Sequence, residues 1–281
     1  MLIFTKITEL QAFLAQTNGK KQTVGFVPTM GALHLGHISL IKASKKECDI
    51  TICSIYVNPT QFNDKNDLER YPKTPEKDLE LLSNIACDVV FVPTTEEMYS
   101  SKEERIFDFG YLDKILEGSH RPGHFNGVAL IISKFFDIVK PYKAFFGSKD
   151  YQQVMIVKAL VKQLHYDVEI KSCPILREED GLAMSSRNAL LNPDERKAAK
   201  IFPWLMDEVK ALKEKGADIN EIKNMVEVSL KKNSIYKLDY LAICDAASLK
   251  ELNSFNEAQS YVVLIACFVG KIRLIDNIIL S

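Results

Sequence analysis

The stretch Gly25-Phe-Val-Pro-Thr-Met-Gly-Ala-Leu-His34-Leu-Gly-His37 carries the strongest structural signal in the chain. An apolar run typical of a buried strand enters a glycine-containing turn, and two histidines around a second glycine then begin a helix. The N-terminus of a helix attracts anions through its backbone N–H groups and its dipole. His34 and His37 are three residues apart, so both imidazoles lie on one face and can reach the same phosphate.

An isolated His-x-x-His pair has a simpler interpretation, as two exposed histidines that cap a helix. The preceding strand, the Pro-Thr-Met-Gly turn and Gly36 favour a phosphate site instead. Imidazole can donate to an oxyanion whether it is neutral or charged, which suits a site where charge develops during reaction. The stretch therefore predicts a site for nucleotidyl transfer.

The composition indicates a sizeable core and no strong charge bias. The 281 residues are 47% hydrophobic with a formal net charge of −1, so we expect two domains and no nucleic-acid partner. No apolar run reaches membrane-spanning length, and the N-terminus lacks the features of a signal peptide, so we expect no membrane partner. The six scattered cysteines form no Cys-x-x-Cys pair, which predicts reduced thiols and a cytoplasmic location.

Strand and helix patterns alternate from residue 22 to about residue 175. This alternation predicts an α/β domain with a mostly parallel sheet and helices on both faces. Ligands bind such sheets beyond the carboxyl ends of the strands, and polar clusters at 29–37, 58–61 and 147–150 each follow a predicted strand. Strands are predicted at 23–27, 50–57, 89–92, 144–146 and 168–173, and helices at 36–46, 75–86, 127–139 and 150–164.

The pattern changes after Arg177. Two helices are predicted at 194–215 and 220–232, followed by strands at 238–244, 261–269 and 271–277. We expect residues 1–176 to form the first domain and residues 177–281 a smaller α+β domain. The hinge should lie near 174–181, where proline and a charged Arg-Glu-Glu-Asp-Gly run interrupt the apolar pattern.

Two further clusters contain groups that bind phosphate. In Gly147-Ser-Lys149-Asp150 the glycine permits close backbone approach, the lysine supplies a cation, and the aspartate can cap the next helix. In Ser185-Ser186-Arg187-Asn188 two hydroxyls and a guanidinium could clamp a triphosphate as a domain closes. Taken alone, the first cluster could be a capped surface helix and the second a serine-rich turn.

Other polar residues are ambiguous at this level. The Arg121-Pro-Gly-His124 segment either contributes a further charge to the site or forms a structural turn. Asp64, Asp67 and Asp78 are expected to be solvated acids, with an outer-shell role toward magnesium as the alternative. No P-loop, no Gly-x-Gly-x-x-Gly after a strand and no His-Glu-x-x-His occurs. A nucleotide site must therefore depend on the histidine motif.

Seven segments recur together and in order along nearly the whole chain, weakening only in the helices after residue 195. They are VPTMGALHLGH (27–37), VNPTQF (57–62), RYPKTPEKDLELL (70–82), RPGHFNGV (121–128), FFGSKDYQQ (145–153), REEDGLAMSSRN (177–188) and RLIDN (273–277). This set resembles the pantoate–β-alanine ligases, which are part of the nucleotidylyltransferase superfamily with the His-x-Gly-His motif. Single motifs would indicate only the superfamily, whereas the combination is specific to these ligases.

The resemblance implies a Rossmann-like N-terminal domain, a smaller C-terminal lid and a homodimer formed through the N-terminal domains. It also implies an ATP- and Mg²⁺-dependent condensation of (R)-pantoate with β-alanine to give pantothenate. Pantoate would attack the α-phosphorus of ATP to give pantoyl adenylate and pyrophosphate, and the β-alanine amine would then release AMP. Such an enzyme must stabilise charge at phosphorus while it holds the reactants in line.

The resemblance assigns an expected role to each matched position. His37 would be a general acid or a transition-state donor, and Gln61 and Gln153 would hold pantoate, with Gln61 also facing β-alanine. Mg²⁺ would be held by ATP phosphates and water, without a named protein ligand. The expected catalytic residues are His34, His37, Lys149, Ser185, Ser186 and Arg187. The expected nucleotide-binding residues are Met30, Gly31, Ala32, Leu33, His34, Leu35, Gly36, His37, Gly147, Ser148, Lys149, Asp150, Leu176, Met184, Ser185, Ser186 and Arg187.

Two positions depart from the family pattern. Ser148 stands where relatives often have glutamate, so we expect any contact there to come from the backbone. Leu35 replaces a frequent acidic residue, and we expect it to point away from the phosphates. One alternative function is a transferase with another acceptor, which the two glutamines and the Ser-Ser-Arg-Asn segment oppose. The other is a catalytically inactive nucleotide-binding protein, which the intact histidine pair, Lys149 and Arg187 oppose.

Overall fold

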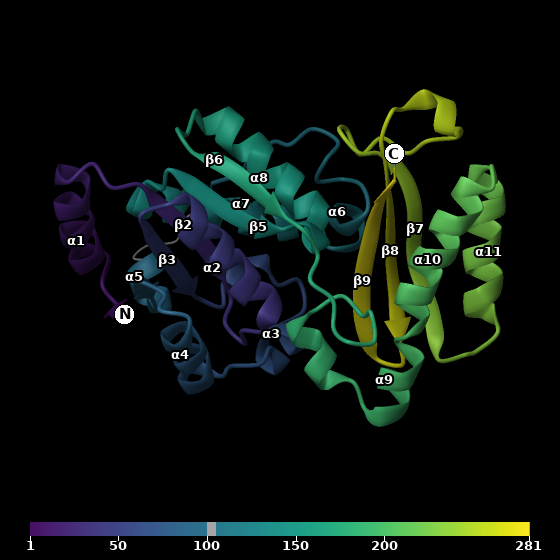
Figure 1. Ribbon diagram of the computed structural model, residues 1–281, viewed down its shortest axis with the longest axis horizontal. Helices are drawn as coiled ribbons and strands as arrows, with labels where there is room; N and C mark the ends of the chain where they lie inside the picture. Colours follow the sequence, from purple (N-terminus) through teal and green to yellow (C-terminus); the bar gives the residue numbers. More distant parts are fainter. Residues whose placement is uncertain (100–104, 281) are drawn as a thin grey trace. The chain divides into compact units, whose positions relative to one another are not determined.

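The computed structural model describes residues 1–99 and 105–280 (Figure 1). These residues form two compact units, Met1–Pro174 and Ile175–Ser281. None of the described helices combines the length and the apolar character needed to span a bilayer. Each unit has its own sheet and its own hydrophobic core.

A six-stranded parallel sheet forms the first unit, with the strand order β1-β4-β3-β2-β5-β6. The chain runs from β2 through β3 to β4 on one side and then adds β5 and β6 on the other, so the strand order reverses between β2 and β5. Ligands of open α/β sheets bind at such a switch point. The parallel sheet predicted from the sequence is confirmed. Edge strand β1 also belongs to this sheet and was not predicted. The strands are β1 Leu2–Phe4, β2 Val24–Thr29, β3 Ile50–Ile55, β4 Val89–Phe91, β5 Lys143–Gly147 and β6 Glu169–Cys173.

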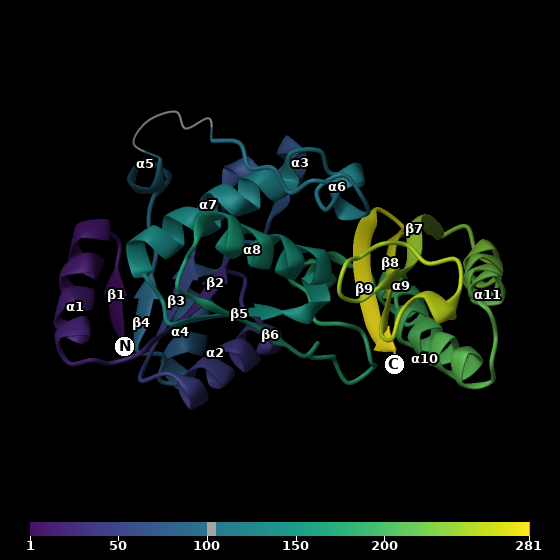
Figure 2. The ribbon, with the colours of Figure 1, turned by 90° about the horizontal axis from the view of Figure 1, so that it is seen from above.

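Helices cover both faces of this sheet, as Figure 2 shows for α7 and α8 on one side and α2 and α4 on the other. Helix α1 packs with α7. Side chains alternate along each strand, so Phe26 packs toward α7 while Val27 packs toward α2, and both are fully buried. Such strands give nearly continuous apolar runs in the sequence. The helices are α1 Ile7–Gly19, α2 Leu35–Glu47, α4 Pro75–Asn84, α7 His124–Val139 and α8 Tyr151–Leu164.

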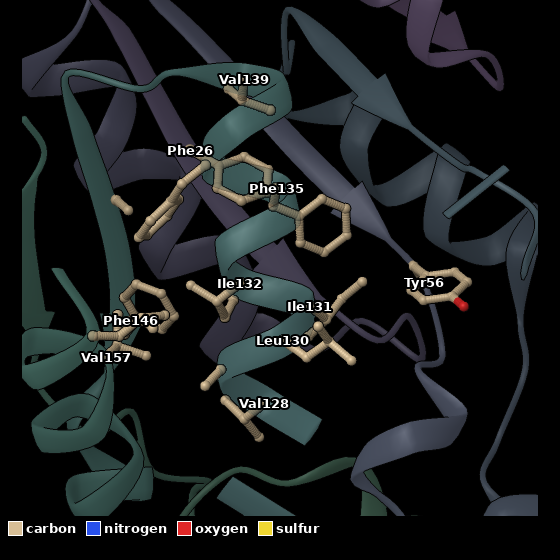
Figure 3. Packing of buried hydrophobic residues seen from close by; sticks show 14 of the residues in the cluster. Phe26, Tyr56, Val128, Leu130, Ile131, Ile132, Phe135, Val139, Phe146 and Val157 are labelled. Atoms are coloured by element: carbon tan, nitrogen blue, oxygen red, sulfur yellow. The ribbon is translucent and has the colours of Figure 1, made fainter. Parts of the chain in front are cut away.

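The core layer beneath α7 fixes the strands relative to this helix (Figure 3). The ring of Phe135 lies 5.4 Å from that of Phe26 and meets Tyr56 edge-on at 6.5 Å. Phe146 of β5 and Val157 of α8 complete this part of the cluster. Each buried side chain of this size contributes about 1.5–3 kcal/mol. The strand ends that carry the site loops are therefore held firmly.

Helix α7 begins three residues before the predicted position. Gly127, the predicted start, lies inside the helix, where a Cβ atom would come within 2.2 Å of the Thr60 carbonyl oxygen. The glycine thus permits close packing of α7 on η1 and does not mark a helix boundary. The short helices of this unit are η1 Pro59–Gln61, α3 Lys65–Arg70, α5 Thr95–Met98, α6 Glu117–His120 and η2 Ser148–Asp150.

The second unit has an antiparallel sheet in the order β7-β8-β9, with α10 and α11 packed on it. The single helix predicted at 194–215 is wrong, because the chain forms α9 and then α10. Pro203 has no N–H for the carbonyl of Ala199, so it fits the first turn of a new helix but not the middle of a continuous one. The elements are η3 Ser186–Leu190, α9 Pro193–Ala198, α10 Ile201–Glu214, α11 Ile219–Lys231, β7 Tyr236–Asp245, η4 Phe255–Glu257, β8 Tyr261–Val269 and β9 Ile272–Leu280.

Candidate active site

Three polar loops leave the same edge of the first unit's sheet. Thr29 is paired with Ile55 across β2 and β3, and Phe26 is paired with Ala144 across β2 and β5. Because these strands are parallel, the loops that follow β2, β3 and β5 begin at neighbouring positions around the switch point. The prediction that the polar clusters follow neighbouring strand ends is confirmed.

His34 and His37 lie together in the first turn of α2. The His34 Nδ1 atom accepts a hydrogen bond from the Gly36 N–H at 3.1 Å, and the His34 N–H donates to His37 Nδ1 at 3.3 Å. The two ring centroids are 4.1 Å apart. A backbone N–H can only donate, so both Nδ1 atoms are unprotonated and the ring proton of each neutral imidazole lies on Nε2. Each histidine of the pair is therefore an Nε2–H donor.

The pKa of the half-buried His37 is lowered to about 3. Desolvation is the largest cause, and the electrostatic influence of His34 and then of Lys149 lowers the pKa further. His37 is therefore neutral at pH 7, which favours a hydrogen-bond donor over a general acid, the two roles that the sequence left open. Lys149 lies on the loop after β5, the strand that pairs with β2, and this pairing places the loop beside the turn that carries the histidines.

Several backbone amides before α2 are already bonded to protein groups. The Gly31 N–H donates to Thr29 Oγ1 at 3.2 Å, while the N–H groups of Ala32 and Leu33 donate to the Asp78 carboxylate at 2.9 and 2.8 Å. Two more amides of the motif are bonded to the imidazoles. The expectation that these backbone N–H groups are available to bind an anion is therefore wrong at these positions. Recognition of an anion at this turn depends more on the imidazole Nε2–H groups.

The loop after β5 differs in one respect from its predicted form. Asp150 precedes α8, but its side chain makes no capping hydrogen bond, because residues 148–150 form the turn η2 and Asp150 lacks the extended backbone of a cap. Its carboxylate lies 3.9 Å from Lys149 Nζ. A Cβ atom at Gly147 would meet no other atom within 4 Å, which agrees with a position that a ligand can approach closely. Ser148 is half-buried beside it.

Gln61 is buried on η1, and neighbouring side chains orient its amide. Asn58 Nδ2 donates to Gln61 Oε1 at 3.3 Å, and Gln61 Nε2 contacts the Met30 sulfur at 3.0 Å. Tyr99 donates to Asn58 Oδ1 at 2.8 Å, a contact that no motif in the sequence indicated. Thioether sulfur is a weak acceptor, so a substrate oxygen could replace it. Gln153 lies half-buried in the first turn of α8.

His124 is a buried structural residue. Its Nδ1 lies 2.8 Å from the Gln61 carbonyl oxygen and its Nε2 lies 3.1 Å from Arg121 Nη1. A carbonyl only accepts and a guanidinium only donates, so Nδ1 carries the proton. Burial first, and the Arg121 charge second, lower the pKa of His124 to about 4. For His124 the structure shows the second of the two interpretations of this segment, a structural turn. The histidine connects α7 to Gln61 through its hydrogen bond to the Gln61 carbonyl oxygen.

We expect the free energy of unfolding to fall as the pH drops from about 6.5 to 4. The pKa of His124 in the folded chain, about 4, lies below its ordinary value of 6.5, so the unfolded chain binds the proton first. The contribution of His124 to stability, which is present above pH 6.5, is thus lost toward pH 4 by up to roughly 3 kcal/mol. His37, whose pKa is also lowered, adds a loss in the same direction. Urea unfolding followed by circular dichroism across this range measures the effect. The His124→Gln variant should show a shallower pH dependence, and an unchanged slope would contradict the assignment.

Ser185, Ser186 and Arg187 lie at the start of η3 in the second unit. The Ser185 hydroxyl accepts a hydrogen bond from the Arg187 N–H at 3.2 Å, so the serine-rich segment is a capped turn. Met184 and Leu176, two other predicted nucleotide-binding residues, are hydrogen-bonded to each other. The Met184 N–H donates to the Leu176 carbonyl oxygen at 3.0 Å. The role of these residues toward a triphosphate stays a prediction.

A network of charged and polar side chains holds this segment within the second unit. Asn188 Nδ2 donates to Glu178 Oε1 at 2.6 Å, and Arg196 bridges Glu178 and Asp180 at 2.6 and 2.7 Å. Glu178 and Arg196 are 18 positions apart in the sequence. The network joins the start of the segment to α9 and to the turn that carries the serines.

Arg177 anchors the same segment on the sheet. Its Nη1 and Nη2 atoms donate to the two carboxylate oxygens of Asp276 on β9, at 2.7 and 3.0 Å, and Nη1 also donates to the Gly181 carbonyl. The Asp276 side chain is fully buried, whereas Arg177 is 30% exposed. A bidentate pair fixes both distance and orientation. The sequence motifs around these two residues therefore have a structural role that motif reading did not assign.

The reversed strand order, the neutral histidine pair and the nearby lysine are the features of a nucleotide-using α/β enzyme. The sequence profile described as pantoate-beta-alanine ligase matches residues 2–279, and the chain belongs to this family of ligases. The pantothenate synthetase of Porphyromonas gingivalis strain W83 is 44% identical over 278 residues, covering 99% of each chain.

Solved structures agree with this membership. Pantothenate synthetase from Thermus thermophilus has a TM-score of 0.93 and 37% identity, covering 99% of each chain. Pantoate–β-alanine ligase from Francisella tularensis, described as complexed with beta-gamma ATP and β-alanine, has a TM-score of 0.82 and 36% identity over 99% of this chain and 97% of that one. The fold class and the family predicted from the sequence motifs are confirmed.

Proposed function

We propose that the ATP-dependent condensation of pantoate with β-alanine, which family membership assigns to this chain, runs through pantoyl adenylate. A pantoate carboxylate oxygen attacks the α-phosphorus of ATP and pyrophosphate leaves. The β-alanine amine then attacks the acyl carbon, forms the amide bond of pantothenate and displaces AMP. The histidine pair, with both Nε2–H groups as donors beside Lys149, is the observation that carries this proposal.

The neutral state of His37 suits the first step. Charge builds on the phosphate oxygens as the new bond forms, and a donor that is already in place stabilises this charge more in the transition state than in the ground state. Lys149 supplies a positive charge for the departing pyrophosphate. His34 holds the start of α2 through its Nδ1 atom and supplies the second Nε2–H.

The second unit would supply the remaining triphosphate contacts. We assign this role to Ser185, Ser186 and Arg187, on a segment that charged networks hold in place. Residues 1–176 would then bind ATP and pantoate, and residues 177–281 would act as a lid. Among the described residues, no three His, Cys, Asp or Glu side chains form a group suited to a metal ion. We propose that Mg²⁺ arrives bound to the ATP phosphates and water.

Two further properties belong to the proposal. The six cysteines are unpaired, and burial raises the pKa of thiols such as Cys53 and Cys244, which suits a reducing cytoplasm. A homodimer through the N-terminal domains is inferred from the resemblance, and sedimentation at several concentrations would test it.

Replacing Gln61 with alanine should raise the KM for pantoate by about 10–100-fold. This factor corresponds to the binding free energy of one or two hydrogen bonds to a charged group. Gln61 Nε2 contacts the weak acceptor Met30 in the structure, so a pantoate oxygen is the stronger partner. ATP binding should stay unchanged, as measured by titration calorimetry. The exposed Gln163→Ala variant on α8 is the matched control. Equal losses for ATP and pantoate would show that Gln61 supports the fold instead.

The test of the proposed function is an assay with Mg·ATP and pantoate, with and without β-alanine, in which pyrophosphate and AMP are followed separately. Pyrophosphate should appear with pantoate alone, while AMP and pantothenate should require β-alanine. A protein that binds ATP but releases no pyrophosphate with pantoate would contradict the proposal. That result would favour a transferase with another acceptor acid.

A further inference from the structure

Asp78 of α4 is a buried carboxylate bound to the turn that precedes α2. It is 1% exposed, and its Oδ2 accepts from the Ala32 N–H at 2.9 Å. Its Oδ1 accepts from the Leu33 N–H at 2.8 Å and from the Thr74 hydroxyl at 3.1 Å. Both oxygens are therefore engaged by the protein. The expectation from sequence that Asp78 is a solvated acid is wrong, because α4 packs it under the turn.

The turn needs such an anchor because its backbone is unusual. Gly31 and Ala32 both have positive φ angles, of 79° and 49°. A left-handed conformation is unfavourable for alanine, so contacts from outside the turn must hold it. A Cβ atom at position 31 would lie 3.0 Å from Asp78 Oδ2, so glycine leaves room for the carboxylate to approach. The carboxylate and the left-handed turn thus fit each other.

The anchored amides lie directly before the histidine pair. Leu33 precedes His34, and the N–H of His34 is the group that donates to His37 Nδ1. The direction of this N–H depends on the peptide planes that Asp78 holds. We propose that Asp78 is a positioning residue, whose carboxylate sets the turn so that the His34 amide bonds to His37 Nδ1 and the His37 proton stays on Nε2. This inference rests on the proposed role of the histidine pair.

The first test needs only the unaltered protein. The imidazole ¹⁵N shifts of His37 distinguish the two neutral tautomers, and we expect the Nε2–H form. A spectrum of the Nδ1–H form would overturn the proposal without reference to activity. Absence of pantoate-dependent pyrophosphate release in the same protein would instead contradict the proposed function, so the two failures are distinguishable.

The second test uses Asp78→Asn, which keeps the size of the side chain but turns an N–H₂ group toward the turn. We expect kcat to fall by roughly 10–100-fold, the effect of a small misplacement of reacting groups, with each KM changing by less than about threefold. The His37 spectrum should become a mixture of tautomers. Unchanged kcat and an unchanged spectrum would overturn the proposal.

Asp88→Asn is the matched control, because the Asp88 carboxylate also accepts a backbone N–H in this unit, from Thr51 at 2.8 Å. It should leave both turnover and the His37 spectrum unchanged.

A double-mutant cycle then separates positioning from general support of the fold. If Asp78 acts through His37, Asp78→Asn should slow the His37→Ala protein much less than it slows the unaltered protein. Equal slowing in both backgrounds would overturn the positioning role.

Discussion

Replacing His37 with alanine is expected to slow pantoate-dependent pyrophosphate release by about 10²–10³-fold, as for loss of one donor from an oxyanion site. The Nδ1 atom of His37 accepts from the backbone, so Nε2–H is the group available to a phosphate. The contact should strengthen as charge develops, so kcat should fall more than the affinity for ATP. Stopped-flow measurement of pyrophosphate, with ATP affinity measured separately, checks this expectation.

A conservative variant separates a neutral donor from a proton-transferring residue. His37→Gln retains a neutral N–H near the Nε2 position and should recover part of the rate lost in the alanine variant. The pKa of His37, lowered to about 3, also predicts that its titration causes no change of rate between about pH 5 and 8. A glutamine variant as slow as the alanine variant, together with a pH inflection that disappears in both, would identify His37 as a general acid.

Replacing Arg177 with alanine should lower the free energy of unfolding of the second unit by about 3–5 kcal/mol, because a buried charge is left without its partner. The Asp276 carboxylate is fully buried and receives two hydrogen bonds from Arg177. Trp204 is the single tryptophan of the chain and lies on α10, so its fluorescence reports on this unit. Urea unfolding followed at this residue measures the loss.

The ion pair between Lys223 and Glu251 provides the control. It is short, at 2.6 Å, but the Glu251 side chain is 59% exposed. An exposed pair contributes about 0–1 kcal/mol, so Lys223→Ala should barely change the unfolding curve. Similar losses for the two variants would mean that burial of Asp276 does not determine the strength of the Arg177 contact.

Much of the first unit could be predicted because its signals are local. Strands buried on both faces give continuous apolar runs, and amphipathic segments between them give a parallel sheet with covered faces. The rule that ligands bind beyond strand ends then grouped three loops that are far apart in the sequence. Family motifs supplied the chemistry, since no local pattern assigns a substrate to Gln61 or Gln153.

The contacts that could not be predicted join residues distant in the sequence. Asp78 lies 46 positions from Ala32, and periodicity carries no information about such a pair. The Nε2–H state of His37 depends on the angle of one amide, which only the folded turn defines. Pro203 is different, because proline in a sequence is a known indicator of the first turn of a helix. The helical periodicity of residues 194–215 nevertheless led to the prediction of one continuous helix.

The tautomers of the histidine pair also determine which small molecules suit this turn. Both Nδ1 atoms are occupied by backbone N–H groups, so an inhibitor meets two donors and a lysine, and no acceptor from the rings. Compounds that offer oxygen acceptors, neutral or anionic, match this polarity, whereas amines and amidines would place donor against donor. A chemical library for this enzyme should accordingly be selected for acceptor groups that can reach the two Nε2–H atoms.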